Sequence, residues 1–144
     1  MDEFSYQKWK VENMKNSKVL QAILIISGLM LAGFGAAILL MPVEMAALNG
    51  IELGGQISLL SETRAPGGAL LASGVLVMSG AFVARLTFTS IVVSALVYLS
   101  YGLSRILSMA IDGMPAEGLV QVAVLEMVTG LVCVFALVKY RENE

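Results

Sequence analysis

The sequence contains no histidine and only one cysteine, Cys133. Without histidine the chain cannot supply the usual ligands of haem or catalytic zinc, or a Ser-His-Asp triad. A single cysteine excludes an intrachain disulfide and every multi-cysteine metal or redox motif. A P-loop, a dinucleotide-binding glycine motif and metal-ligand spacings are absent as well. The sequence therefore predicts a protein that is not an enzyme and that has no cofactor and no metal site.

Charged residues are also scarce. Only 14% of the 144 residues are charged, whereas 58% are hydrophobic and the mean hydropathy is +0.84. This composition is typical of integral membrane proteins, so the predicted environment is a lipid bilayer. The formal net charge is −2, and the basic residues form no stripe that could track phosphates. Nucleic acid is therefore not expected as a partner.

Four apolar runs follow one another along the chain, and each is long enough to cross a bilayer as one helix. The predicted spans are residues 19–41, 63–84, 87–111 and 119–138. They form one domain, 19–138, between a polar N-terminal segment at 1–18 and a cytoplasmic tail at 139–144. The predicted fold class is all-α, an integral membrane four-helix up-down bundle.

Prolines and small residues mark details of these spans. Pro42 ends the first span, and the segment around it is predicted to form a short interfacial helix. Pro66 is predicted in the first turn of the second span, with Ser61 as its N-cap. In the first span a four-residue repeat of small residues predicts close helix packing: Gly28, Ala32 and Ala36. Glycines six apart in the second span predict only local packing points: Gly68, Gly74 and Gly80.

Seven of the nine lysines and arginines lie on one side of the predicted bundle. This side holds both termini and the turn between the second and third spans, with Lys8, Lys10, Lys15, Lys18, Arg85, Lys139 and Arg141. The two opposite loops contain neither residue, so both termini are predicted to be cytoplasmic. The predicted location is the bacterial inner membrane, crossed several times. For residues 1–18 two alternatives remain, an interfacial helix or a flexible tail.

The third predicted span has a line of polar side chains on one helical face. They are separated by alternating steps of four and three residues: Ser94, Tyr98, Tyr101, Arg105, Ser108 and Asp112. This spacing keeps them on one face of a helix. An arginine and two tyrosines cannot face lipid without a loss of free energy. The stripe is therefore expected to face other helices or water.

A depth argument predicts partners for Arg105. The turn between the third and fourth spans centres near Pro115, with Arg105 ten residues before it and Glu126 eleven residues after it. At about 1.5 Å per residue these side chains reach a similar depth on adjacent antiparallel helices, so an Arg105–Glu126 ion pair is predicted. Glu62 and Arg64 begin the second span from the same side, and all four charges are expected to meet.

Two interpretations of this predicted cluster stay open. In the first, the charges neutralise one another and set the register of the bundle. In the second, they form a pocket on the outer side that holds an anionic or polar headgroup. The predicted charge cluster consists of Glu62, Arg64, Arg105, Asp112 and Glu126. The predicted pocket lining consists of Ser94, Tyr98, Tyr101 and Ser108.

Several motifs together resemble a known family. They are SETRAPGGALLASG at the start of the second span, YGLSRILSMAIDGMP in the third, and the glutamate of VAVLEMVTG in the fourth. They resemble the small bacterial membrane family catalogued as domain of unknown function 4345. The resemblance covers nearly the whole chain after the N-terminal segment. It implies a four-helix membrane fold with a DoxX-like layout and no established activity.

The function predicted from these observations is that of a non-enzymatic binding or accessory subunit with an outer-side polar pocket or ion-pair cluster. The alternative is a small carrier for a lipid-like or anionic solute, with or without proton coupling. The predicted partners are the bilayer, a lipid or small anionic ligand, and either further copies of the chain or a larger membrane complex.

Overall fold

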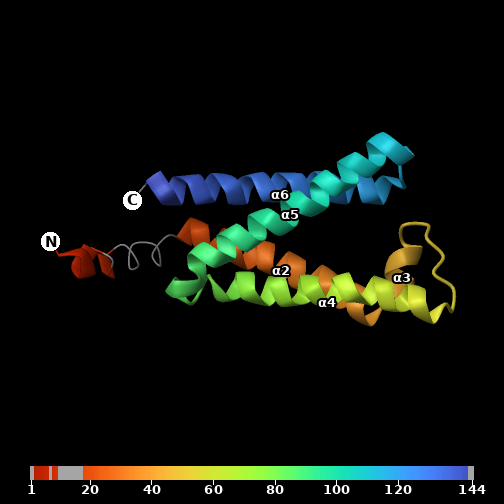
Figure 1. The fold of residues 1–144 in the computed structure, drawn as a ribbon, viewed down its shortest axis with the longest axis horizontal. Coiled ribbons are helices and arrows are strands. Elements are labelled where there is room, and N and C mark those ends of the chain that lie inside the picture. The colour runs from red at the N-terminus through yellow and green to blue at the C-terminus, as the bar shows by residue number, and fades with distance from the viewer. Residues whose placement is uncertain (1, 7, 10–17, 143–144) are drawn as a thin grey trace.

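The computed structural model describes residues 2–6, 8–9 and 18–142, and all regular structure within them is helical (Figure 1). Four long helices and one short helix follow the N-terminal segment: α2 (Lys18–Leu40), α3 (Pro42–Ala47), α4 (Ile57–Ser79), α5 (Ala84–Asp112) and α6 (Glu117–Glu142). This confirms the all-α prediction, and α3 is the short helix expected around Pro42. Residues 3–6 and 8–9 are also helical, whereas 10–17 lie outside the described residues.

Three helices are long and apolar enough to cross a membrane by themselves: α2, α5 and residues 117–139 of α6. The prediction of four such helices was therefore wrong in the case of α4. This helix begins at Ile57 and ends at Ser79, instead of running from 63 to 84. Glu62 therefore joins Arg64 within α4, and glycines and serines occupy seven of its 23 positions. Fewer large apolar side chains remain to offset the cost of insertion.

The earlier start of α4 also changes the role of two residues predicted at its beginning. Gln56, in an extended conformation, is the N-cap, and it makes no side-chain capping bond. Ser61 is therefore not the cap, and Pro66 lies inside the helix instead of in its first turn. Because proline lacks an N–H, the Glu62 carbonyl one turn earlier loses its regular helical donor.

The long helices alternate in direction and form two closely packed pairs. One pair is α2 with α4, and the other is α5 with α6, while α2 and α6 barely touch. The two described ends of the chain lie at the same end of the molecule as the α4–α5 connection, and α3 lies at the opposite end (Figure 1). Helix α5 crosses from α4 near that connection to α6 further along. The space between the two pairs is therefore bordered by α2, α5 and α6.

Glycines bring the backbones of α2 and α4 into contact. A Cβ atom added to Gly74 would lie 2.6 Å from the carbonyl oxygen of Gly28, and one added to Gly67 would lie 2.7 Å from the backbone nitrogen of Leu39. Gly35 likewise faces the backbone of α4 at Gly67. The contact thus repeats every seven residues on each helix, as in antiparallel helices packed like a coiled coil. The sequence-based prediction identified the small-residue ridge of α2 but missed this shared repeat.

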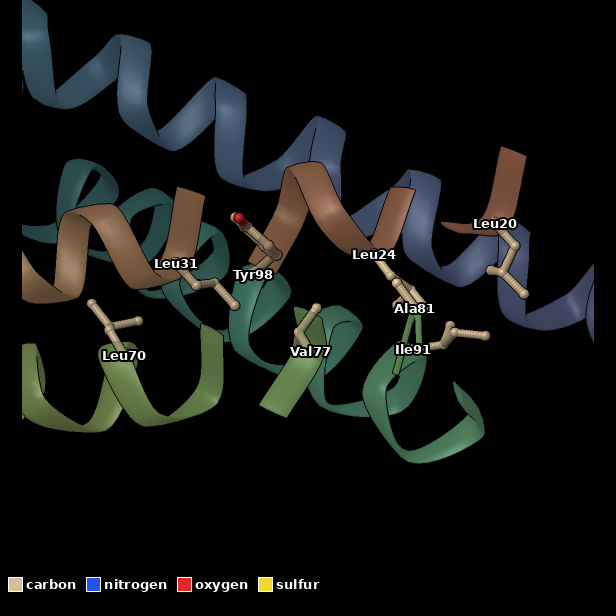
Figure 2. Close-up of a cluster of buried hydrophobic side chains, with 8 residues drawn as sticks. All are labelled: Leu20, Leu24, Leu31, Leu70, Val77, Ala81, Ile91 and Tyr98. Atoms are coloured by element: carbon tan, nitrogen blue, oxygen red, sulfur yellow. The ribbon is translucent and has the colours of Figure 1, made fainter. Parts of the chain in front are cut away.

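The apolar core lies where α2, α4 and α5 meet (Figure 2). Its buried side chains are Leu20, Leu24, Leu31, Leu70, Val77, Ala81, Ile91 and Tyr98. Two hydroxyl groups of α5 join this core to the C-terminal end of α4. The Thr87 hydroxyl donates to the Gly80 carbonyl at 2.8 Å, and the Ser90 hydroxyl donates to the Leu76 carbonyl at 3.0 Å. The last carbonyl groups of a helix have few or no regular backbone donors, and these two hydroxyl groups supply additional ones.

Candidate functional site

A cavity of about 80 Å³ lies between the two helix pairs. Its walls are apolar side chains of α2, α5 and α6, together with Leu70 of α4, and its polar lining comes from Tyr98, Tyr101, Arg105 and Glu126. Two of the lining residues, Phe34 of α2 and Leu125 of α6, are also exposed on the outer surface. The cavity therefore opens sideways, between α2 and α6, and not only towards one end of the molecule.

The charged part of the cavity is an ion pair between α5 and α6. Arg105 Nε donates a hydrogen bond to Glu126 Oε2 at 2.9 Å, and the two side chains are 32% and 13% exposed. Close packing of the helices supports this geometry, because Gly102 and Gly130 leave room for Met127 and Leu99 of the facing helix. The structure confirms the predicted Arg105–Glu126 pair. Helix depth was a sufficient guide here because α5 and α6 are antiparallel neighbours along much of their length.

The pair leaves hydrogen-bonding capacity unused. Among the described residues, the two terminal nitrogens of Arg105 donate to no protein group, and Glu126 Oε1 accepts from none. An arginine has five N–H donors in a planar fork that matches carboxylate and phosphate groups. The exposed fraction of Arg105 shows that this fork is not enclosed by protein. The ion pair can therefore bind a further polar group without being broken.

The two tyrosines of the predicted stripe both line the cavity, but in different ways. Tyr98 is buried, and its hydroxyl donates to the Ser27 carbonyl of α2 at 2.7 Å. Tyr101, one turn closer to Arg105, is half-buried, and its hydroxyl has no hydrogen-bond partner in the part of the chain that the structure describes. Tyr98 thus holds α5 against α2, while the Tyr101 hydroxyl is available to a ligand.

The other two residues predicted to line the pocket lie elsewhere. Ser94 is fully buried, and its hydroxyl lies 3.2 Å from the sulfur of Cys133 in a contact between α5 and α6. Ser108 is exposed, and its hydroxyl donates to Asp112 Oδ2 at 3.0 Å within the last turn of α5. The prediction was wrong for both because α5 packs against different helices along its length. Residues on one of its faces therefore lie in different surroundings. Asp112 also lies outside the cavity.

Glu62 and Arg64 do not join the Arg105–Glu126 pair, so the predicted cluster of four charges is not formed. Glu62 is exposed, and Arg64 borders a separate open groove between α4 and α2, beside Leu39 and Leu60. The similar predicted depth of the four charged residues suggested that they contact one another, but α4 contacts α5 mainly near their connection. The first turns of α4 therefore lie away from α6, as Figure 1 shows.

Most of the cavity wall was not predicted from the sequence. Phe34, Leu70, Val97 and Val122 line it, but nothing in the sequence distinguishes them from the other apolar residues of their helices. Among the described residues, the structure has no group of three or more His, Cys, Asp or Glu side chains that could hold a metal ion.

Comparison with known proteins gave one match. The family model described as Domain of unknown function (DUF4345) matches residues 19–137. No curated protein and no solved structure matches the chain. The family predicted from the sequence motifs is thus confirmed, and the matched range includes every residue of the cavity. The DoxX-like layout stays a prediction.

Proposed function

The chain belongs to the family described as Domain of unknown function (DUF4345), and we propose that it is a membrane protein that binds one amphipathic lipid between α2, α5 and α6 without catalysing a reaction. One observation carries this proposal. The cavity between the helix pairs is apolar along its walls, but its polar lining includes an arginine with unused donors. An apolar site with a few fixed polar groups is typical of pockets that orient an amphipathic ligand.

The proposal includes all four long helices in the bilayer, with α4 inserted as the partner of α2. Both termini are cytoplasmic in this arrangement. It is supported by the charges at the two ends of the molecule. Lys18 and Arg85 lie at the end of the chain termini, whereas Glu44 of α3 and Glu117 at the start of α6 lie at the other end. Positively charged residues favour the cytoplasmic side. The Arg105–Glu126 pair then lies nearer the outer surface.

The cavity is too small to enclose a whole lipid. A cavity needs roughly 10–15 Å³ of probe volume for each water molecule, so one of about 80 Å³ has room for a polar headgroup but not for the acyl chains of a lipid. The lateral opening beside Phe34 and Leu125 lets the rest of an acyl chain lie along the groove between α2 and α6. In this arrangement the lipid stays in contact with the bilayer while its polar group contacts Arg105.

Filling the cavity tests the proposal. The Val122→Phe substitution adds a ring at the cavity wall, whereas Val124→Phe adds the same ring to an exposed position of the same helix. Native mass spectrometry of the full chain, released from membranes in mild detergent, reports bound lipid directly. We expect several-fold less retained lipid for Val122→Phe and wild-type retention for Val124→Phe, at equal unfolding temperatures.

Equal lipid retention by both variants would contradict a ligand site in this cavity. A protein that also moves the lipid would be a carrier, as in the alternative prediction from the sequence. Reconstitution into liposomes with labelled lipid in one leaflet separates the two functions. A binding protein leaves the label in its leaflet, with or without a pH gradient. Gradient-dependent transfer of the label would replace the binding proposal with the carrier.

A further inference from the structure

We propose that the cavity selects a zwitterionic phospholipid whose headgroup has both a phosphate and a primary ammonium group. This inference rests on the proposed lipid-binding function and adds the class of headgroup. Its basis is the charge composition of the cavity. Arg105 and Glu126 are the charged side chains that line it among the described residues, and they contribute one positive and one negative charge. The lining is therefore neutral in total but strongly polar at one place.

The arginine provides the phosphate site. Arg105 contacts Glu126 through Nε, and its two terminal nitrogens donate to no other group among the described residues. Two parallel N–H donors match the spacing of two phosphate oxygens. The Tyr101 hydroxyl lines the same cavity, bonds to no group in the described part of the chain and adds a third donor. A phosphate can thus be bound while the Arg105–Glu126 bond is kept.

The glutamate provides the complementary ammonium site. Glu126 Oε2 accepts from Arg105, and Oε1 accepts from no group of residues 2–6, 8–9 or 18–142. A primary ammonium has three N–H donors, one of which can bind Oε1, whereas a quaternary ammonium has none. The Tyr101 ring also lines the cavity, and aromatic faces attract cations. Glu126 therefore favours a headgroup with N–H donors over one that is fully methylated.

The same arrangement disfavours a lipid with a net negative charge. Such a headgroup satisfies Arg105, but it brings its charge close to the Glu126 carboxylate, which is mostly buried and only weakly screened by solvent. A headgroup with both charges meets an opposite charge at each contact. Glu62, Arg64 and Asp112 do not line the cavity and so do not alter this balance.

Competition between headgroups tests the inference. The full-length wild-type protein is incubated with equal amounts of phosphatidylethanolamine, phosphatidylcholine and phosphatidylglycerol that share the same acyl chains. Native mass spectrometry then measures which lipid is retained. We expect phosphatidylethanolamine to exceed phosphatidylglycerol by about tenfold, the effect of roughly one charge-assisted hydrogen bond at a partly exposed site. Phosphatidylcholine is expected between them.

Substitution of the glutamate should reverse the order. Glu126→Gln leaves the cavity with one net positive charge, so phosphatidylglycerol is expected to be retained above phosphatidylethanolamine. Glu117→Gln removes the same charge at an exposed position outside the cavity and is the matched control. The control should keep the wild-type preference. An unchanged order in Glu126→Gln would overturn the inference.

The wild-type protein alone also gives a decisive result, in case Glu126→Gln does not fold. Stepwise N-methylation of phosphatidylethanolamine removes N–H donors without changing the phosphate, and retention is expected to fall at each step. Flat retention across this series, or a wild-type preference for phosphatidylglycerol, overturns the headgroup assignment while lipid binding stands. If Val122→Phe retains as much lipid as the wild type, the proposed function itself is wrong.

Discussion

At the scale of single residues, polar side chains in this protein have two separate roles. Thr87, Ser90 and Tyr98 donate from α5 to carbonyl groups of α4 or α2, and each such bond holds two helices together. Arg105 and Tyr101 also lie on α5, but they keep donors that no described protein group uses. The first group is expected to affect stability and the second to affect ligand binding, although all five belong to one polar face.

The two tyrosines allow a direct comparison of these roles. Tyr98→Phe removes a buried hydrogen bond of 2.7 Å to the Ser27 carbonyl, which links α5 to α2. We expect a loss of about 1 kcal/mol in the free energy of unfolding. Tyr101→Phe is the control, because its hydroxyl bonds to no described residue, and its stability should equal that of the wild type. Reversible unfolding in mixed micelles measures both, and equal stabilities would contradict the assigned roles.

At the scale of helices, the pairing of α2 with α4 explains how α4 can be held in a membrane. This helix is not apolar enough to cross by itself. Its glycine face, however, lies against the backbone of α2 at Gly28, Ala32 and Gly35, so much of its polar backbone is covered by protein instead of lipid. Small residues at helix interfaces allow such close approach, and the resulting contact area stabilises association in lipid.

A larger residue at the centre of this contact should separate the two helices. A Cβ at Gly74 would meet the backbone of Ala32 and the carbonyl of Gly28, and neither can move aside as a flexible side chain would. Gly74→Leu is therefore expected to cost more than about 3 kcal/mol, above the usual range for overpacking. Gly68→Ala, on the same helix, meets no atom within 4 Å and should leave stability unchanged or slightly higher. Thermal unfolding in detergent compares them.

At the scale of the whole molecule, the helix directions divide the protein into two ends. The described ends of the chain and the α4–α5 connection share one end, and α3 and the α5–α6 turn share the other (Figure 1). The two helix pairs meet mainly through α5, which leaves the lateral cavity between them. In the proposed arrangement in the membrane, this cavity faces the bilayer and not the aqueous phase.

Labelling of introduced cysteines tests the proposed topology. Cys133 is fully buried, so the wild-type chain should give little background with a membrane-impermeant thiol reagent. Leu48→Cys and Met114→Cys, both exposed at the α3 end, are expected to react in intact cells. Phe82→Cys, exposed beside the α4–α5 connection, should react only after the cells are opened. Reaction of Phe82→Cys in intact cells would reverse the assigned orientation.

The polar lining of the cavity could be derived from the sequence, but its apolar wall could not. The Arg105–Glu126 pair followed from depth along adjacent antiparallel helices, which depends only on residue spacing. The prediction that Glu62 and Arg64 join this pair was wrong, because equal depth does not determine which helices are neighbours. The prediction that Ser94 and Ser108 line the pocket was wrong for a related reason. Side chains on one face of a long helix contact different partners along its length.

The sequence by itself determined the all-helical class, the family and the membrane-like character of the chain, because these depend on local hydropathy and short motifs. Tertiary structure alone decided that α4 pairs with α2 through Gly28, Gly35, Gly67 and Gly74, and that a cavity lies between the helix pairs. The physical reason is that interhelical packing depends on the relative rotation and crossing of whole helices. Many arrangements bury the same apolar residues, and only close steric contacts distinguish them.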